Sequence, residues 1–205
     1  MKKLVFFIAA LFMTYFAQAQ GEIKVGIKAG GNFSNWTGDD VEAFEELFDT
    51  KMEYKFGFHA GLFADYSFSE MVSVRPELLY SLKGWKMEEE DETFKVNLSY
   101  IDVPILARIK AGALFFELGP TVSFNVASKY KLTGGDEDED GDFKDVFGGD
   151  PETVDIGYAA GLGYELPVGV GIGLRYNGGL SKVAEDGKVY NSNFMLSLSY
   201  AFGGR

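Results

Sequence analysis

Apolar and polar residues alternate with a period of two over most of the chain after residue 22. In the run 114–126, for example, Phe116 and Leu118 occupy one set of alternate positions, and Glu117 and Gly119 occupy the other. Because successive side chains of a β-strand point to opposite faces, this spacing predicts strands with one apolar and one polar face. Eight segments carry the pattern: 23–33, 55–66, 72–83, 96–109, 114–126, 154–166, 170–177 and 191–202.

The segment 96–109 is the least regular of the eight. Its alternation is clean from Ile101 to Ile109, but Leu98 and Tyr100 fall on the opposite parity. An extra residue in one strand shifts the parity in this way, so we expect a β-bulge or a rim position near Tyr100. Prolines delete a donor from the ladder, and those within the segments are also expected at bulges or near the rims. They are Pro76, Pro104 and Pro120.

The connections between the segments alternate in length. Four long polar stretches take turns with three short ones: 34–54, 85–95, 128–153 and 181–190 against 67–70, 110–112 and 167–169. Outer-membrane barrels have an even number of antiparallel strands, long extracellular loops and short periplasmic turns. We therefore expect an all-β fold, an eight-stranded antiparallel up-and-down transmembrane β-barrel with both termini in the periplasm. The first long connection should hold a helical turn or two, because apolar residues recur there at helical spacing: Val41, Phe44, Leu47 and Phe48.

Alternation alone also fits a soluble barrel that buries its apolar face, such as a periplasmic lipocalin-like carrier. The polar face favours the lipid-facing arrangement, because it carries many glycines and charges of both signs, and an eight-stranded barrel is just wide enough for its own side chains to fill. We expect these charges to pair inside the barrel as a structural polar network. Its predicted members are Lys28, Arg75, Glu77, Asp102, Arg108, Glu117, Glu165 and Arg175.

The first nineteen residues have the pattern of an export signal. Lys2 and Lys3 precede a largely apolar run of about 13 residues, which is shorter than the roughly 20 that a membrane-spanning helix needs, and a small-x-small site ends at Ala19. We therefore expect a signal peptide at 1–19 and an outer-membrane barrel domain at 20–205.

Composition narrows the possible functions further. The formal net charge of the 205 residues is −12 at pH 7, so nucleic acid is not an expected partner. The chain has no Cys and one His, which excludes a disulfide scaffold, a cysteine nucleophile and a multi-histidine metal centre. No phosphate-binding glycine motif occurs, and no cofactor or metal is expected.

Several stretches together resemble a known family. They are 26–34 (GIKAGGNFS), 75–80 (RPELLY), 100–106 (YIDVPIL), 157–163 (GYAAGLG) and 173–180 (GLRYNGGL). The mature chain is similar to the small "porin family" outer-membrane β-barrel domain, a PorT-like group common in Bacteroidetes-type genomes. The resemblance implies an eight-stranded barrel of the OmpA/OmpX type, with neither a demonstrated pore nor a catalytic set. Such barrels usually end on an aromatic residue recognised by the insertion machinery, whereas here Phe202 is followed by Gly203, Gly204 and Arg205.

Three features could carry chemistry, and each has a plainer interpretation. The acidic run 136–142 begins like a calcium-binding loop but has Phe147 where the bidentate Glu belongs, which favours a solvated loop. His59 has inward parity, so it is expected to be a hydrogen-bonded interior side chain rather than part of a lipid-facing Ser-His-acid set. Glu77 and Glu117 share the inward face with arginines, so ion pairing is expected rather than acid–base catalysis.

Our leading hypothesis is a non-enzymatic outer-membrane barrel whose loops serve envelope structure or surface binding. The alternative is a narrow channel for ions or small solutes, and a lipid-modifying barrel enzyme is a weaker alternative. The expected partners are outer-membrane lipids, the barrel-insertion machinery and an extracellular ligand of the loops, and the protein is expected to be a monomer.

Overall fold

The computed structural model describes residues 22–89, 92–134, 138–183 and 187–202. The expected signal peptide lies outside these residues. Within them, no helix is long and apolar enough to cross a membrane.

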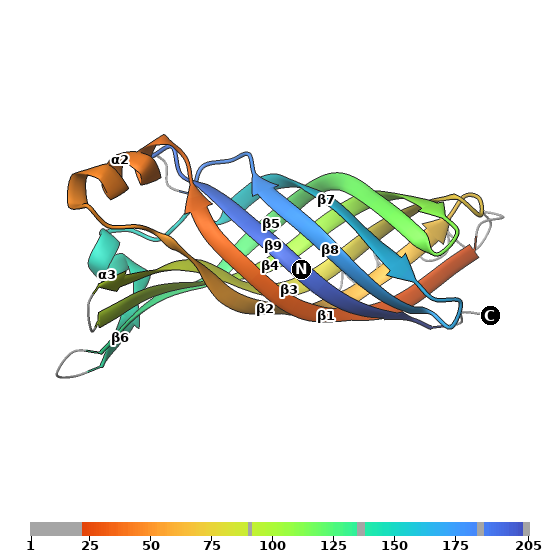
Figure 1. The fold of residues 1–205 in the computed structure, drawn as a ribbon, viewed down its shortest axis with the longest axis horizontal. Helices are drawn as coiled ribbons and strands as arrows, with labels where there is room; N and C mark the ends of the chain where they lie inside the picture. The colour runs from red at the N-terminus through yellow and green to blue at the C-terminus, as the bar shows by residue number, and fades with distance from the viewer. Residues whose placement is uncertain (1–21, 90–91, 135–137, 184–186, 203–205) are drawn as a thin grey trace, which may run out of the picture.

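The described chain is built almost entirely of antiparallel strands (Figure 1). Its elements in chain order are β1 (Glu22–Thr37), α2 (Asp39–Phe48), β2 (Glu53–Ser67), β3 (Val72–Glu89), β4 (Glu92–Ala111), β5 (Leu114–Thr133), β6 (Glu139–Asp142), α3 (Phe143–Phe147), β7 (Val154–Glu165), β8 (Val170–Gly179) and β9 (Tyr190–Ala201).

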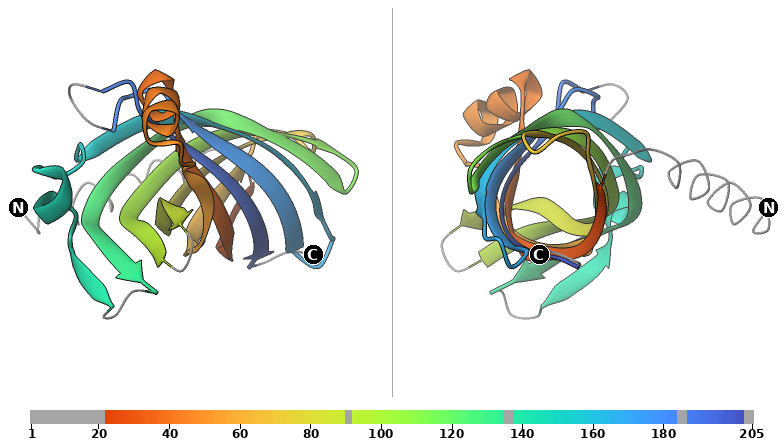
Figure 2. Two further views of the ribbon diagram at one scale, coloured as in Figure 1. Left: turned by 60° about the vertical axis from the view of Figure 1, so that its left-hand side comes forward. Right: turned by 90° about the vertical axis from the view of Figure 1, so that its right-hand side faces the viewer.

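Eight of these strands close into a ring, which is seen end-on in the right-hand view of Figure 2. The ring order is β1, β2, β3, β4, β5, β7, β8 and β9, and β9 pairs with β1 from Gly26↔Ala201 to Thr37↔Tyr190. Closure satisfies the backbone groups that an open edge would leave unpaired in hydrocarbon. The predicted eight-stranded up-and-down barrel is therefore confirmed.

The two faces of the strands point as the alternation predicts for a membrane barrel. Leu62, Phe116 and Ile156 on the outside are 59%, 53% and 51% exposed, whereas Arg75 and Glu117 on the inside are 2% and 7% exposed. A soluble barrel would bury the first set and expose the second. The soluble-carrier alternative is therefore wrong.

Strands extend into two of the predicted long loops. β3 and β4 continue into the stretch 85–95 as a hairpin, and β5 runs to Thr133 before β6 pairs back against it. Figure 1 shows this part of the sheet projecting beyond one end of the ring. Once a strand leaves the bilayer, polar residues are allowed on its outer face, which explains why this stretch reads as loop in the sequence.

Smaller expectations have mixed outcomes. The bulge near Tyr100 is confirmed by a register shift between Ser99 and Tyr100 in the β4–β5 ladder, and α2 confirms the predicted helical turns.

The prolines do not lie at bulges. Each lies inside a ladder whose register is the same on both sides of it, with pairs such as Pro76↔Ile105, Pro104↔Thr121 and Pro120↔Tyr158. The neighbouring pairs hold the strands together, so one missing donor does not displace them.

Candidate functional site

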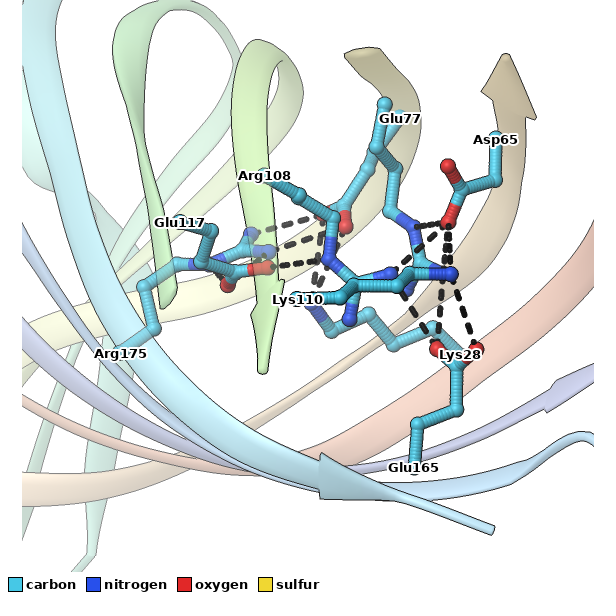
Figure 3. A network of polar contacts seen from close by, with 9 residues as sticks. Lys28, Asp65, Glu77, Arg108, Lys110, Glu117, Glu165 and Arg175 are labelled. Carbon is cyan, nitrogen blue, oxygen red and sulfur yellow. Dashed lines mark hydrogen bonds and ion pairs between the residues drawn. The ribbon is translucent and has the colours of Figure 1, made fainter. Parts of the chain in front are cut away.

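Charged side chains from four strands meet in the middle of the barrel interior (Figure 3). Glu77 on β3 accepts a hydrogen bond of 3.1 Å from Lys28 on β1. It also accepts two, of 2.7 and 2.9 Å, from the guanidinium of Arg175 on β8. Arg175 donates a third bond, from Nε, to Glu117 on β5 at 2.7 Å. Each buried charge here has a partner of opposite sign, which is the condition under which burial of charge is tolerated.

A second group of ion pairs lies next to the first, nearer the end of the barrel that carries the short turns. Asp65 on β2 accepts hydrogen bonds from Arg75 on β3 and from Arg108 on β4, the latter at 2.8 Å. Both arginines also bond to Glu165 on β7 at 3.2 Å, and Lys110 approaches Glu165 at 3.3 Å. Arg108 reaches Glu117 at 3.4 Å and so joins the two groups.

Two aromatic side chains, Phe63 and Phe115, lie on the otherwise polar inner face beside the arginines of the second group. The guanidinium carbon of Arg75 lies 4.0 Å from the ring centroid of Phe63, and that of Arg108 lies 3.8 Å from the centroid of Phe115. These are cation–π distances, so each arginine is held by a ring as well as by carboxylates.

Of the eight predicted network residues, seven lie in these two connected groups and Asp102 lies apart. Asp102 accepts a hydrogen bond of 2.8 Å from Lys83, farther toward the end of the barrel that carries the long loops. The predicted set did not include Asp65, Lys83 or Lys110. Inward parity marks Asp65 and Lys83 in the sequence, whereas Lys110 was assigned to a turn, although it is the penultimate residue of β4.

His59 is an interior residue, 1% exposed, with both ring nitrogens engaged. Nδ1 lies 2.8 Å from the amide oxygen of Asn32, and Nε2 lies 2.9 Å from the hydroxyl of Ser197. The imidazole is thus held by neutral groups on β1 and β9, with neither a lipid-facing position nor a carboxylate partner.

Two small cavities lie among the described interior residues. One of about 20 Å³ lies beside Lys83, Thr121 and Asn193, and another of about 10 Å³ lies beside Lys28 and Arg175. Spaces of this size hold at most a single water molecule. The side chains around the charged network are therefore closely packed.

An apolar cluster lies at the end of the barrel that carries the long loops. Trp36 and Trp85 are nearly fully buried, with ring centroids 5.6 Å apart, and Phe143 of α3 packs edge-on against Trp36 at 6.1 Å. The strand extensions, α2 and the last loop all contribute residues to this cluster. The buried members are Trp36, Val41, Trp85, Val96, Leu98, Tyr100, Phe143 and Val183.

The first and last of the long loops are joined by hydrogen bonds. Lys188 donates from Nζ to Asp39 at 2.7 Å and from its backbone N–H to Asp40 at 2.8 Å. The hydrogen bond and charge of Lys188 lower the pKa of Asp39, and Asp39 in turn raises the pKa of Lys188. The two acidic residues at the start of α2 also suit the positive end of the helix dipole.

The calcium-loop pattern is not matched by the backbone. Gly141, which would form the sharp turn of such a loop, lies in β6 opposite Tyr130, and residues 136–137 lie outside the described part of the chain. Among the described residues, no group of three or more His, Asp or Glu side chains could hold a metal ion.

Comparisons with known proteins agree with this architecture. Residues 16–185 match the family model of the outer membrane protein beta-barrel domain. Neisserial surface protein A has a solved structure that is 16% identical, with a TM-score of 0.50 over 87% of this chain and 97% of that one. The attachment invasion locus protein Ail of Yersinia pestis is 19% identical, with a TM-score of 0.47 over 88% and 99%. The first of these shows a shared fold. No match to a curated protein was found.

Proposed function

Because this chain belongs to the outer membrane protein beta-barrel domain family, we propose that it is a non-enzymatic, closed outer-membrane barrel that acts through its extracellular loops in envelope structure or surface binding. The observation that carries this proposal is the contact between Arg175 and Glu77, which crosses the interior from β8 to β3. A side-chain bridge across a narrow barrel supports a closed interior rather than an open channel.

The capped extracellular end supports the same proposal. Trp36, Trp85 and Phe143 cover the mouth of the barrel, so a solute would meet an apolar layer before it reached the charged interior. Rigid scaffolds with elaborated loops commonly bind at those loops. The extended hairpins and the two helices give this chain such a surface.

A barrel enzyme that modifies lipids would need its nucleophile and base on the outer face, where its substrate lies. His59 is buried between Asn32 and Ser197, which supports a structural role for this histidine. The partners we propose are lipids of the outer membrane, the barrel-insertion machinery and an extracellular ligand at the loops, with a monomer as the working unit.

We further propose that the chain is cleaved after Ala19 and that both ends of the mature protein lie in the periplasm. Amino-terminal sequencing of protein extracted from outer membranes tests the cleavage. Tags placed at either end should resist protease added to intact cells, and digestion of either tag would contradict this orientation.

Conductance in planar bilayers tests the closed state. The refolded protein, first shown to be folded by heat-modifiable gel mobility, should give no discrete current steps at moderate voltage. Reproducible steps from the wild-type barrel would favour the narrow channel instead.

A further inference from the structure

The helix α2 presents an apolar tip formed by the exposed Leu47 and Phe48 and the partly buried Phe44. Leu47 is 77% exposed and Phe48 is 60% exposed, although the rings of Phe44 and Phe48 lie with their centroids 4.7 Å apart. Val41 is the buried residue of the helix and anchors it in the apolar cluster. Large apolar side chains held together in water mark a surface that another molecule covers.

The helix is held in place at both ends, so the tip has a fixed position. At its start, Asp39 and Asp40 bind Lys188 of the last loop. At its end, a carboxylate oxygen of Glu45 accepts a hydrogen bond of 2.8 Å from the backbone N–H of Met52. A partner that docks on the tip would therefore spend little free energy on ordering it.

The charged residues of α2 are all acidic. Glu42 and Glu46 lie in the helix and Asp49 caps its end, no basic residue lies in the last turn, and the nearest lysine along the chain is Lys51, beyond the helix. That turn is also the negative end of the helix dipole, where a cation is stabilising and a carboxylate is not. The tip thus combines an apolar patch with a negative potential that this helix leaves uncompensated.

We propose that the α2 tip docks a cationic amphipathic segment of an extracellular polypeptide, with its apolar side chains on Leu47 and Phe48 and its ammonium or guanidinium groups at Glu46 and Asp49. This inference rests on the proposed role of the loops in binding and names the class of partner. A second copy of the chain would bring the same acidic face, and an anionic lipid surface would also be repelled. Charge complementarity therefore selects a cationic partner.

Fluorescence anisotropy with labelled peptides tests the proposal, using the mature protein in phosphatidylcholine nanodiscs and empty nanodiscs as the reference. Three helical peptides of one length serve as probes: one of Lys and Leu, one with Glu in place of Lys, and one with Ser in place of Leu. The Lys/Leu peptide should bind the protein at least about tenfold more tightly than either of the others, because both apolar burial and opposite charge are needed.

Paired variants locate the site. Leu47→Gln with Phe48→Gln, and separately Glu46→Gln with Asp49→Asn, should each weaken binding of the Lys/Leu peptide about tenfold. The matched control, Glu89→Gln with Glu92→Gln, removes two charges from the tip of the β3–β4 hairpin and should change binding less than about twofold. Asn is chosen at Asp49 because that residue has a left-handed backbone, which Asn tolerates.

Equal weakening by the hairpin control, or equal binding of the Ser-containing peptide, would overturn the proposal in favour of diffuse electrostatic attraction. Unchanged binding by either α2 variant would overturn it as well. Heat-modifiable mobility of every variant verifies its fold. A failure here would leave the non-conducting barrel untouched, since that proposal is tested by current alone.

Discussion

Arg175 on β8 and Glu77 on β3 join opposite walls of the barrel through two hydrogen bonds of 2.7 and 2.9 Å. In the ring, three strands separate β3 from β8 in either direction, so the pair spans the full width of the interior. Backbone ladders bind each strand only to its neighbours. This side-chain bridge therefore adds a constraint on the shape of the ring that the sheet itself does not supply.

Removal of one partner from this bridge should be costly. Glu77→Gln leaves the buried charges of Arg175 and Lys28 without their shared carboxylate and should destabilise the barrel by about 3–5 kcal/mol. The midpoint of urea unfolding, followed by heat-modifiable gel mobility, measures the loss. Glu88→Gln, an exposed acidic residue of the β3 extension, is the control and should leave the midpoint unchanged.

A double variant separates pairing from general damage. Glu77→Gln combined with Arg175→Gln should cost less than the sum of the two single changes, because the second substitution removes a charge that the first has stranded. Additive losses would contradict a direct interaction between the two side chains.

The outer face should reject charge at the depth of the bilayer. Leu118 is 62% exposed in the middle of the apolar side of β5, and Leu118→Arg should destabilise the inserted barrel by about 2–4 kcal/mol. Thr133→Arg places the same side chain at the end of β5, beyond the apolar band, and should cost much less. Equal urea midpoints for the two variants would argue against a lipid-facing β5.

Crowding inside the barrel predicts that alanine substitution at two paired glycines lowers stability by different amounts. A Cβ at Gly163 would lie 2.3 Å from the ring of Phe115, whereas one at Gly173, its register partner, would lie 3.3 Å from the same ring. Gly163→Ala should therefore destabilise the barrel by about 1–3 kcal/mol, and Gly173→Ala should cost clearly less. Unfolding in urea compares the two directly, and a reversed order would contradict the packing of Phe115.

The tie between the first and last loops should loosen in acid. Because Lys188 lowers the pKa of Asp39 in the folded protein, the stabilisation from this carboxyl is present above its ordinary pKa and is lost as the pH falls through the lowered value. The raised pKa of Lys188 keeps the ammonium charged throughout that range.

A spin label at Leu47→Cys can report on this change, since the chain has no other cysteine. The label should be more mobile in acid than at neutral pH. Adding Lys188→Gln should raise its mobility at neutral pH and reduce the difference between the two conditions. An acid response that Lys188→Gln leaves intact would assign the change to other groups.

Most of the fold could be predicted from the sequence because one physical rule governs the barrel. Each strand must show lipid one face and the interior the other, so parity alone placed Leu62 outside and Arg75 inside. The apolar residues Leu98 and Tyr100 drew attention to the place where the β4–β5 register shifts, although both face inward like Asp102 and the extra residue lies in β5. A strand that extends beyond the bilayer needs no apolar outer face, so the alternation is lost there. For this reason the sequence pattern does not predict the extended β3–β4 hairpin or β6.

The ion pairs inside the barrel were harder to predict from the sequence. Parity indicates which charges face inward, but it does not say which of them meet, because contacts across the ring depend on how far each strand is staggered against the next. Glu77 and Arg175 could be assigned to one face, yet their pairing required the closed geometry. Phe63 and Phe115 are apolar residues at inward positions, and their distances from Arg75 and Arg108 explain why they lie there.

The seam between β1 and β9 joins the earliest and latest described strands of the chain. To bring together strands so far apart in the sequence, the chain must lose loop-closure entropy before the new contacts stabilise it. This loss makes assembly of the barrel slow. Until the seam forms, β1 and β9 are bare edges that invite aggregation. Pairing of β1 with β9 is therefore the step that removes the last open edges of the sheet.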